Sequence, residues 1–175
     1  MLEFDTRPND GIRTLAETDK AMRLATNRAT NRGLRFARKI LVRALSARSG
    51  FPQKAIKGRR RSIIQRAVGS NMFGMVWQGT NAIPAGYLGK ARQTKAGAKV
   101  RSKLYPGDFV VTFKSGHRGI MYRTGNSSLP IKERTEEIDH LVSRSAIKRM
   151  VDSRMNDWLD QELSYEFDVK PGRSI

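Results

Sequence analysis

The chain contains no cysteine, and histidine occurs only twice among its 175 residues. The absence of cysteine excludes disulfide bonds, thiolate catalysis and metal sites with cysteine ligands. With His117 and His140 as the only histidines, a zinc site is also disfavoured. No apolar run reaches the roughly 18 residues of a membrane-spanning helix, and the N-terminus lacks the pattern of a signal peptide. We expect a soluble, cytosolic protein with no cofactor and no membrane partner.

Acidic residues are absent from half of the chain. Residues 20–107 contain 21 lysines and arginines and no aspartate or glutamate. Residues 1–19 have a net charge of −3, and residues 108–175 are balanced, with 11 residues of each sign. The net charge of +18 therefore originates in the middle of the chain. Such a stretch faces a polyanion, an acidic protein surface, or the acidic end of its own chain.

Two stretches have the 3.6-residue period of amphipathic helices. The first begins at a capping-box pair, Thr14 and Glu17, and ends at Gly50. Its predicted apolar face contains Met22, Ala25, Ala29, Gly33, Phe36, Ala37, Ile40 and Ala44. The neighbouring face carries a basic stripe of Arg28, Arg32, Arg35, Lys39 and Arg43. The second helix is predicted from about Glu137 to Phe167, with a polar face of balanced charge.

Between these helices the chain has the pattern of short strands and turns. Residues 62–68 and 72–78 are apolar runs separated by Gly-Ser-Asn, which predicts a β-hairpin. A short helical turn is expected at residues 53–56, a loop at residues 79–97, and strands at residues 98–103, 109–113 and 120–123. The order predicts an α+β fold, in which two long helices cover one largely antiparallel sheet of about four to five strands. We expect an arm at residues 1–13, one domain at residues 14–168 and a tail at residues 169–175.

The candidate sites are a glycine-rich turn and clusters of basic residues. His117 lies between Gly116 and Gly119, but a general base needs an orienting partner, and the nearest carboxylate in sequence is Asp108, across a strand. A tight turn is the better interpretation. The basic series around Lys90 and the run Arg59, Arg60 and Arg61 could hold phosphates or form a subunit-facing surface. Sparse aromatic residues nearby argue against a platform for stacking single-stranded nucleic acid.

A series of short motifs resembles a known family. The motifs are Gly89-Lys90-Ala91-Arg92-Gln93-Thr94-Lys95 with Gly97, then Pro106-Gly107, then Ser115-Gly116-His117-Arg118-Gly119, and finally Leu129-Pro130-Ile131. In order and spacing they resemble the minor tail protein Z family of tailed bacteriophages, the tail completion proteins, over about residues 20–165. The chain departs from the family's pattern at Asp108, at Ile120-Met121 and at Arg134-Thr135-Glu136.

The resemblance implies a structural virion protein that is not an enzyme. It implies a tail-terminator-like subunit of a homo-oligomeric, hexameric ring at the head-proximal end of the tail tube, assembled in the host cytoplasm. The expected partners are tail tube and neck or connector proteins, with contact to packaged DNA or to the end of the tape-measure protein. The alternative is a free basic protein that binds duplex nucleic acid.

Two sets of residues are assigned to these contacts. The face toward the lumen, DNA or an acidic partner is expected to contain Arg28, Arg32, Arg35, Lys39, Arg43, Arg59, Arg60 and Arg61. The subunit-interface loops are expected to contain Lys90, Arg92, Gln93, Lys95, Lys99, Arg101, Gly116, His117, Arg118 and Gly119.

Overall fold

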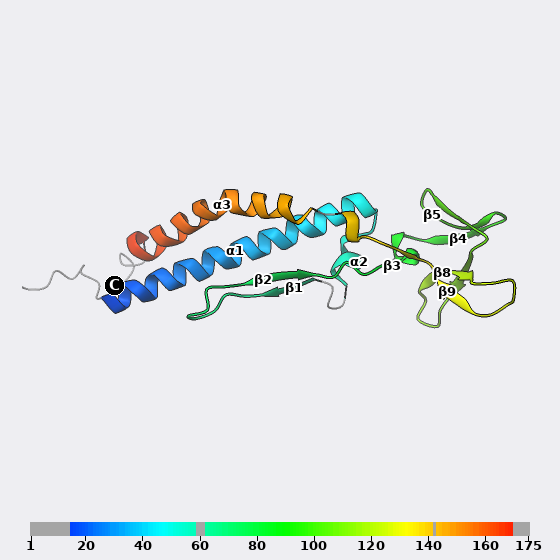
Figure 1. Cartoon of the computed structure of the whole chain (residues 1–175), viewed down its shortest axis with the longest axis horizontal. Helices are drawn as coiled ribbons and strands as arrows, with labels where there is room; N and C mark the ends of the chain where they lie inside the picture. The colour runs from blue at the N-terminus through cyan, green and yellow to red at the C-terminus, as the bar shows by residue number, and fades with distance from the viewer. Residues whose placement is uncertain (1–14, 59–61, 142, 170–175) are drawn as a thin grey trace, which may run out of the picture.

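The computed structural model describes residues 15–58, 62–141 and 143–169. The fold is α+β and elongated, with a long N-terminal helix, α1 (Leu15–Ser49), and an antiparallel C-terminal helix, α3 (Arg144–Ser164), beside it. A hairpin of β1 (Ser62–Gln65) and β2 (Met75–Gln78) runs along another side of α1 (Figure 1). The other strands form a lobe beyond the C-terminal end of α1. The predicted arm and Thr14 lie outside the described residues.

The buried line of α1 consists of small residues that let α3 approach closely. Ala21, Ala25 and Ala29 are at most 5% exposed. A Cβ atom added at Gly33 would lie 2.9 Å from Met155 Cε of α3. Met22 was predicted on the buried face but is 52% exposed, because it lies one residue, about 100°, around the helix from Ala21. The helix ends as predicted, with Gly50 at φ +74.

The second helix is shorter than predicted. It begins at Arg144 because the Ser143 side chain accepts a hydrogen bond from Ala146 N and caps the first turn. The residues upstream are used elsewhere: β10 (Thr135–Glu136) pairs with β3 (Ile83–Pro84), and η2 (Asp139–Leu141) is a 3-10 turn. A π-helical turn, η3 (Tyr165–Val169), continues α3. The Trp158 ring of α3 meets the Phe36 ring of α1 edge-on, with centroids 5.3 Å apart.

The prediction of one sheet with four to five strands is wrong. The described strands form four small antiparallel sheets, of which β1–β2 and β3–β10 are two. The third contains β4 (Ala91–Thr94), β5 (Gly97–Val100) and β6 (Lys103–Pro106), and the fourth contains β7 (Phe109–Thr112), β8 (Arg118–Arg123) and β9 (Ile131–Glu133). Gln93 explains why these two sheets do not merge. Its Oε1 accepts from Val110 N at 2.8 Å, and its Nε2 donates to Asp108 O at 3.4 Å. A side chain of β4 thus bonds to the Val110 amide of β7 and to the Asp108 carbonyl just before it, groups with which a neighbouring strand would otherwise pair.

Other strand boundaries also differ from the predictions. The stretch at residues 98–103 is two strands, because Arg101 adopts φ +50 and turns the chain between β5 and β6. Residues 79–97, predicted as a loop, contain β3, β4 and a 3-10 turn, η1 (Ala85–Leu88). The helical turn is confirmed as α2 (Gln53–Lys57). The hairpin is confirmed with shorter strands, and the Asn27 and Asn31 side chains of α1 donate to the Gly69 and Ala67 carbonyls of its connection.

The main apolar core lies where the end of α1 meets the lobe. It is lined by Val42, Leu45, Phe51, Ile56, Ile83, Ala85, Leu88, Ala91, Ala98, Val100, Tyr105, Ile120 and Ile138. Farther along the body, α1 is covered by one helix and one hairpin, and no described helix or strand lies over either of them (Figure 1). In the described part of the chain, no helix has the length and apolar character needed to cross a membrane.

Candidate interaction surfaces

The predicted basic stripe of α1 is divided into an internal part and an exposed part. Arg28 forms an ion pair with Glu166, whose side chain is 1% exposed, and its guanidinium lies 5.3 Å from the centroid of the Tyr165 ring. Arg32 Nη1 lies 3.2 Å from Glu162 Oε1. These two arginines therefore neutralise carboxylates at the acidic end of the same chain and join α1 to α3 and η3.

Arg35, Lys39 and Arg43 form the exposed part of the stripe. None of the three has an ion pair with a residue that the structure describes. Arg35 and Lys39 line a hollow of about 220 Å³ where α1, α2 and β1 meet. The described residues that line it are Arg35, Arg38, Lys39, Gln53, Lys57 and Ile64. Arg59, Arg60 and Arg61, assigned to the same face from sequence, lie outside the described residues.

Arg38 and Lys57 of this hollow were not found from the sequence. Arg38 stands beside the predicted stripe, and its Nε donates to Ser62 Oγ of β1 at 2.9 Å. Lys57 is on α2. This short helix is held beside the hollow by Ile56, a fully buried residue of the core. No periodic signal in one segment could have indicated that the two segments meet.

In the lobe, some of the predicted interface residues are exposed and others form contacts within the protein. Lys90, Arg92, Lys95 and Lys99 are exposed, and Arg92 stands directly opposite Lys99 in the pairing of β4 with β5. Such like-charged cross-strand pairs are unfavourable unless an anion lies nearby. By contrast, Arg101 Nη1 donates to Gly50 O at 2.8 Å and ties the lobe to the end of α1. Gln93 has the bridging role described above.

The turn at residues 115–119 is tight, as predicted, and is packed by aromatic rings. Gly116 has φ +77, which favours glycine. The His117 ring stacks between two rings, with centroids 4.7 Å from Tyr87 and 5.8 Å from Phe113. Its Nε2 lies 3.7 Å from Glu133 Oε1, beyond hydrogen-bond distance.

The two residues after His117 contribute through their backbone. Gly119 does not have positive φ; a Cβ there would lie 2.7 Å from Phe113 Cε2. Arg118 is exposed, and its carbonyl oxygen lies 2.3 Å from the position of a Cβ added at Gly86. Among the described residues there is also no group of three or more acidic, histidine or cysteine side chains that could hold a metal ion. The turn is thus held in place by the stacking of the His117 ring and by close packing of its backbone.

The outer face of the β1–β2 hairpin is largely apolar and is exposed among the described residues. Ile63 of β1 is 46% exposed and stands opposite Trp77 of β2, which is also 46% exposed. Met75 is 53% exposed on the same face, and Phe73, just before β2, is 84% exposed. Trp77 also borders a groove of about 410 Å³, which is lined in addition by Ala37, Leu41 and Leu45 of α1. We call Ile63, Met75, Trp77 and Phe73 the hairpin patch.

The sequence pattern predicted the two strands of the hairpin but not the exposed hairpin patch. A signal was present: β1 contains Ile63 and Ile64 in succession, and β2 contains Met75, Val76 and Trp77. Strands that are apolar on both faces are typical of sheets covered on both sides. Here α1 covers one side and no described residue covers the other.

Comparison with protein families identifies the relationship that the motif series indicated. A family model described as prophage minor tail protein Z (GPZ) matches residues 8–170. The chain belongs to this family. No curated protein and no solved structure has significant similarity to it. As a member of the minor tail protein Z family, it is a structural component of a phage tail.

Two positions that depart from the minor tail protein Z pattern contact each other. The Asp108 carboxylate, 4% exposed, accepts two hydrogen bonds from Arg134, at 2.8 and 2.9 Å. The Arg134 guanidinium also lies 4.2 Å from the centroid of the Tyr122 ring. The hydrogen bond to Asp108 raises the pKa of Arg134. This ion pair fixes Arg134, the residue between β9 and β10, against the lobe.

A second polar cluster next to this pair involves Glu136. Tyr105 donates to Glu136 Oε1 at 2.8 Å, and Lys103 forms an ion pair with the same carboxylate. Burial and the neighbouring Glu136 raise the pKa of Tyr105. Burial alone would raise the pKa of Glu136, but the hydrogen bonds from Lys103 and Tyr105 lower it. Both clusters stabilise the lobe of this minor tail protein Z, and neither involves Lys90, Arg92, Lys95 or Lys99.

Proposed function

We propose that the chain is a tail completion or terminator-type subunit, which forms a homo-oligomeric ring at the head-proximal end of the tail tube and contributes to the head–tail junction. Membership of the minor tail protein Z family supports a place in the tail. The observation that carries the assembly part is the hairpin patch, an apolar sheet face without a covering layer. Its neighbours in the assembled virion would be tube and neck or connector proteins.

The exposed apolar side chains of the hairpin support a need for assembly. Ile63 and Trp77 are each 46% exposed, Met75 is 53% exposed and Phe73 is 84% exposed. Contiguous apolar surface of this kind marks sites of protein interaction.

Charge favours a second copy of this chain as the occupant of the hairpin patch. The patch is flanked by cations such as Arg66, so two hairpins meeting face to face would bring like charges together. On α3, Asp157 and Asp160 are exposed and form no ion pair with a described residue. A head-to-tail contact between the hairpin of one copy and the α3 side of the next pairs opposite charges. Contacts of this heterologous type generate rings when the rotation closes.

The first test is the mass of the purified full-length chain by light scattering at increasing concentration, combined with Trp77→Ser. Trp77 has about 115 Å² available for burial, which is worth up to about 3 kcal/mol, or roughly 100-fold in association per contact. We expect closed oligomers for the natural chain and a shift to monomer for Trp77→Ser. Met22→Ser, which removes a side chain of similar exposure from the far end of α1, is the control and should assemble normally. A chain that stays monomeric at every concentration would contradict the ring.

We also propose that the protein acts as a structural part and not as a catalyst. The specific support is that the His117 ring stacks on two aromatic rings and that its Nε2 lies 3.7 Å from the Glu133 carboxylate, beyond hydrogen-bond distance. The alternative, a free basic protein that binds duplex nucleic acid, makes a different prediction for localisation. Gold labelling of a tagged chain in infected or induced cells should mark the head-proximal end of tails after assembly in the host cytoplasm. Label that is found only off the virion would favour the alternative.

A further inference from the structure

We propose that the hollow between α1, α2 and β1 is a binding site for the phosphate groups of duplex DNA. Its ligand-binding groups are Arg35, Arg38, Lys39 and Lys57, and its volume of about 220 Å³ admits a phosphate group with part of its sugar. We call these four residues the cationic hollow. The inference concerns the isolated chain and does not depend on the proposed ring.

The described lining of the cationic hollow contains no counter-charge. None of the described residues that line it is acidic, and residues 20–107 contain no aspartate or glutamate. The nearest described carboxylates of α1 in sequence, Glu17 and Asp19, stand at least 16 residues before Arg35, about 24 Å along the helix. Glu162, which reaches α1 from α3, is already paired with Arg32. Within the described residues no carboxylate forms an ion pair with these four cations, so an anion that binds in the hollow would relieve their mutual repulsion.

The arrangement of the cations is supported by the fold. Arg35 and Lys39 are four residues apart on one helix face, a spacing at which like charges destabilise a helix. Arg38 is held in place by its hydrogen bond to Ser62 Oγ, so its guanidinium has less freedom to lose on binding. Lys57 approaches from α2, on the other side of the hollow. Two separate elements, α1 and α2, therefore present positive charge to one point, and β1 holds Arg38 in place.

Continuation of the positive charge along α1 favours DNA over an acidic protein. Arg43 follows Lys39 by one further turn, so the exposed cations from Arg35 to Arg43 extend over about 12 Å. One strand of duplex DNA carries three to four phosphates over roughly that length. A row of cations without interspersed acids or apolar anchors matches such a uniform polyanion. Protein interfaces, in contrast, place aromatic or aliphatic anchors at their centre, and here only Ile64 is available.

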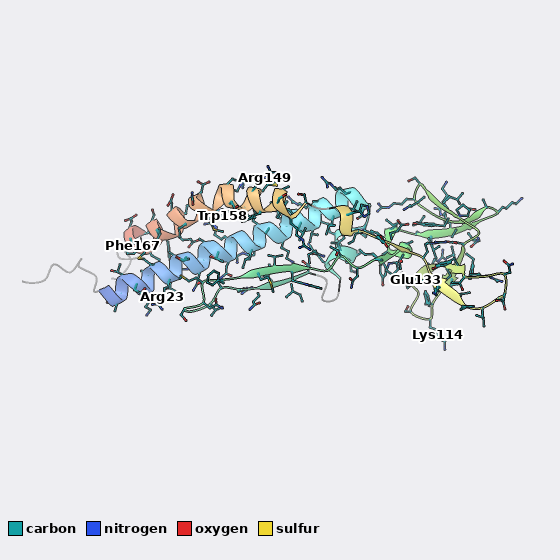
Figure 2. All side chains as sticks on the ribbon, in the orientation of Figure 1. Arg23, Lys114, Glu133, Arg149, Trp158 and Phe167 are labelled. Atoms are coloured by element: carbon teal, nitrogen blue, oxygen red, sulfur yellow. The ribbon has the colours of Figure 1, made fainter. Side chains whose placement is uncertain are left out.

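The experiment compares two variants of the full-length chain with the same change in net charge. The first, Arg35→Gln/Lys39→Gln/Lys57→Gln, removes three charges of the cationic hollow and retains Arg38 with its bond to Ser62. The second, Lys114→Gln/Lys132→Gln/Arg149→Gln, removes three exposed charges that lie elsewhere; Figure 2 shows Lys114 on the lobe and Arg149 on α3. Fluorescence anisotropy with a labelled 25-base-pair duplex of random sequence is measured at several salt concentrations.

We expect the variant of the cationic hollow to bind at least about tenfold more weakly at low salt, with a slope of log affinity against log salt that is shallower by up to about 2.7. The control variant should retain affinity and slope close to those of the natural chain. Equal losses in both variants would show that only net charge matters and would overturn the site. The inference also fails if a poly-glutamate peptide of equal charge competes as well as DNA, because the ligand would then be an acidic protein. Circular dichroism establishes that each variant is folded.

This result is separable from the proposed function. If the chain is found on tails but its hollow binds no DNA, the proposed site is refuted and the structural role stands. A chain that binds DNA through the hollow but is absent from tails would refute the structural role and leave the site intact.

Discussion

Replacement of Arg28 by alanine tests whether the basic stripe of α1 is divided into structural and free parts. Glu166, its partner, is 1% exposed, and removal of one member of a buried ion pair costs about 3–5 kcal/mol, since the buried charge loses compensation by its partner. Arg28 itself is 39% exposed, so water can partly replace it, and we expect the lower end of this range. A loss of about 3 kcal/mol lowers the melting temperature of a chain of this size by roughly 6–12 °C.

The comparison variant is Arg35→Ala, seven residues and about two turns further along the same helix. Arg35 is exposed and forms no ion pair with a described residue, so its replacement should change stability by less than about 0.5 kcal/mol. Thermal unfolding followed by circular dichroism measures both. A double-mutant cycle of Arg28→Ala with Glu166→Gln should recover part of the loss, because the buried charge that Arg28 balances is then also removed. Equal melting temperatures for Arg28→Ala and Arg35→Ala, or no coupling in the cycle, would refute the division.

Three further predictions concern the turn, the lobe and the hairpin patch. Gly116→Val should cost about 1–3 kcal/mol in urea unfolding, because a β-branched residue is strained at φ +77, whereas Gly116→Asn should cost less; equal costs would contradict a conformational cause. Because the folded state lowers the pKa of Glu136, its contribution is present above the unfolded value of about 4.3 and is lost as pH falls through the folded value. Glu136→Gln should therefore lose less melting temperature than the natural chain between pH 5 and pH 3, and parallel curves would refute this. Trp77→Phe should retain more self-association than Trp77→Ser, since a phenyl ring still buries apolar area, and identical effects would count against packing at the hairpin patch.

The helices were predictable because their signals are local. The 3.6-residue period and Gly50 fix the course and the end of α1, and the apolar stripe around Trp158 indicates α3. The N-terminal limit of α3 was misplaced because Ile138 fits the helical period but is buried in the core from a non-helical segment. Spacing alone cannot distinguish an apolar residue on the buried face of a helix from an apolar residue of a non-helical segment that is buried in the core.

The sheet arrangement depended on contacts that no local pattern contains. Whether β4 continues into β7 was decided by the side chain of Gln93, which satisfies backbone groups 15 and 17 residues away. The division of the basic stripe likewise depended on Glu162 and Glu166, about 130 residues beyond Arg32 in the chain. The sequence showed that residues 20–107 must find acidic partners. It could not show which arginines find them within the molecule.

The central claim, that the chain is a ring-forming subunit at the head-proximal end of the tail, is tested most directly by a cryo-electron density map of the assembled tail end. The account predicts a closed ring of copies at that position, with the hairpin patch of each copy buried against the α3 side of the next. A tail end without density for the chain, or a ring in which the hairpin patch faces solvent, would contradict it.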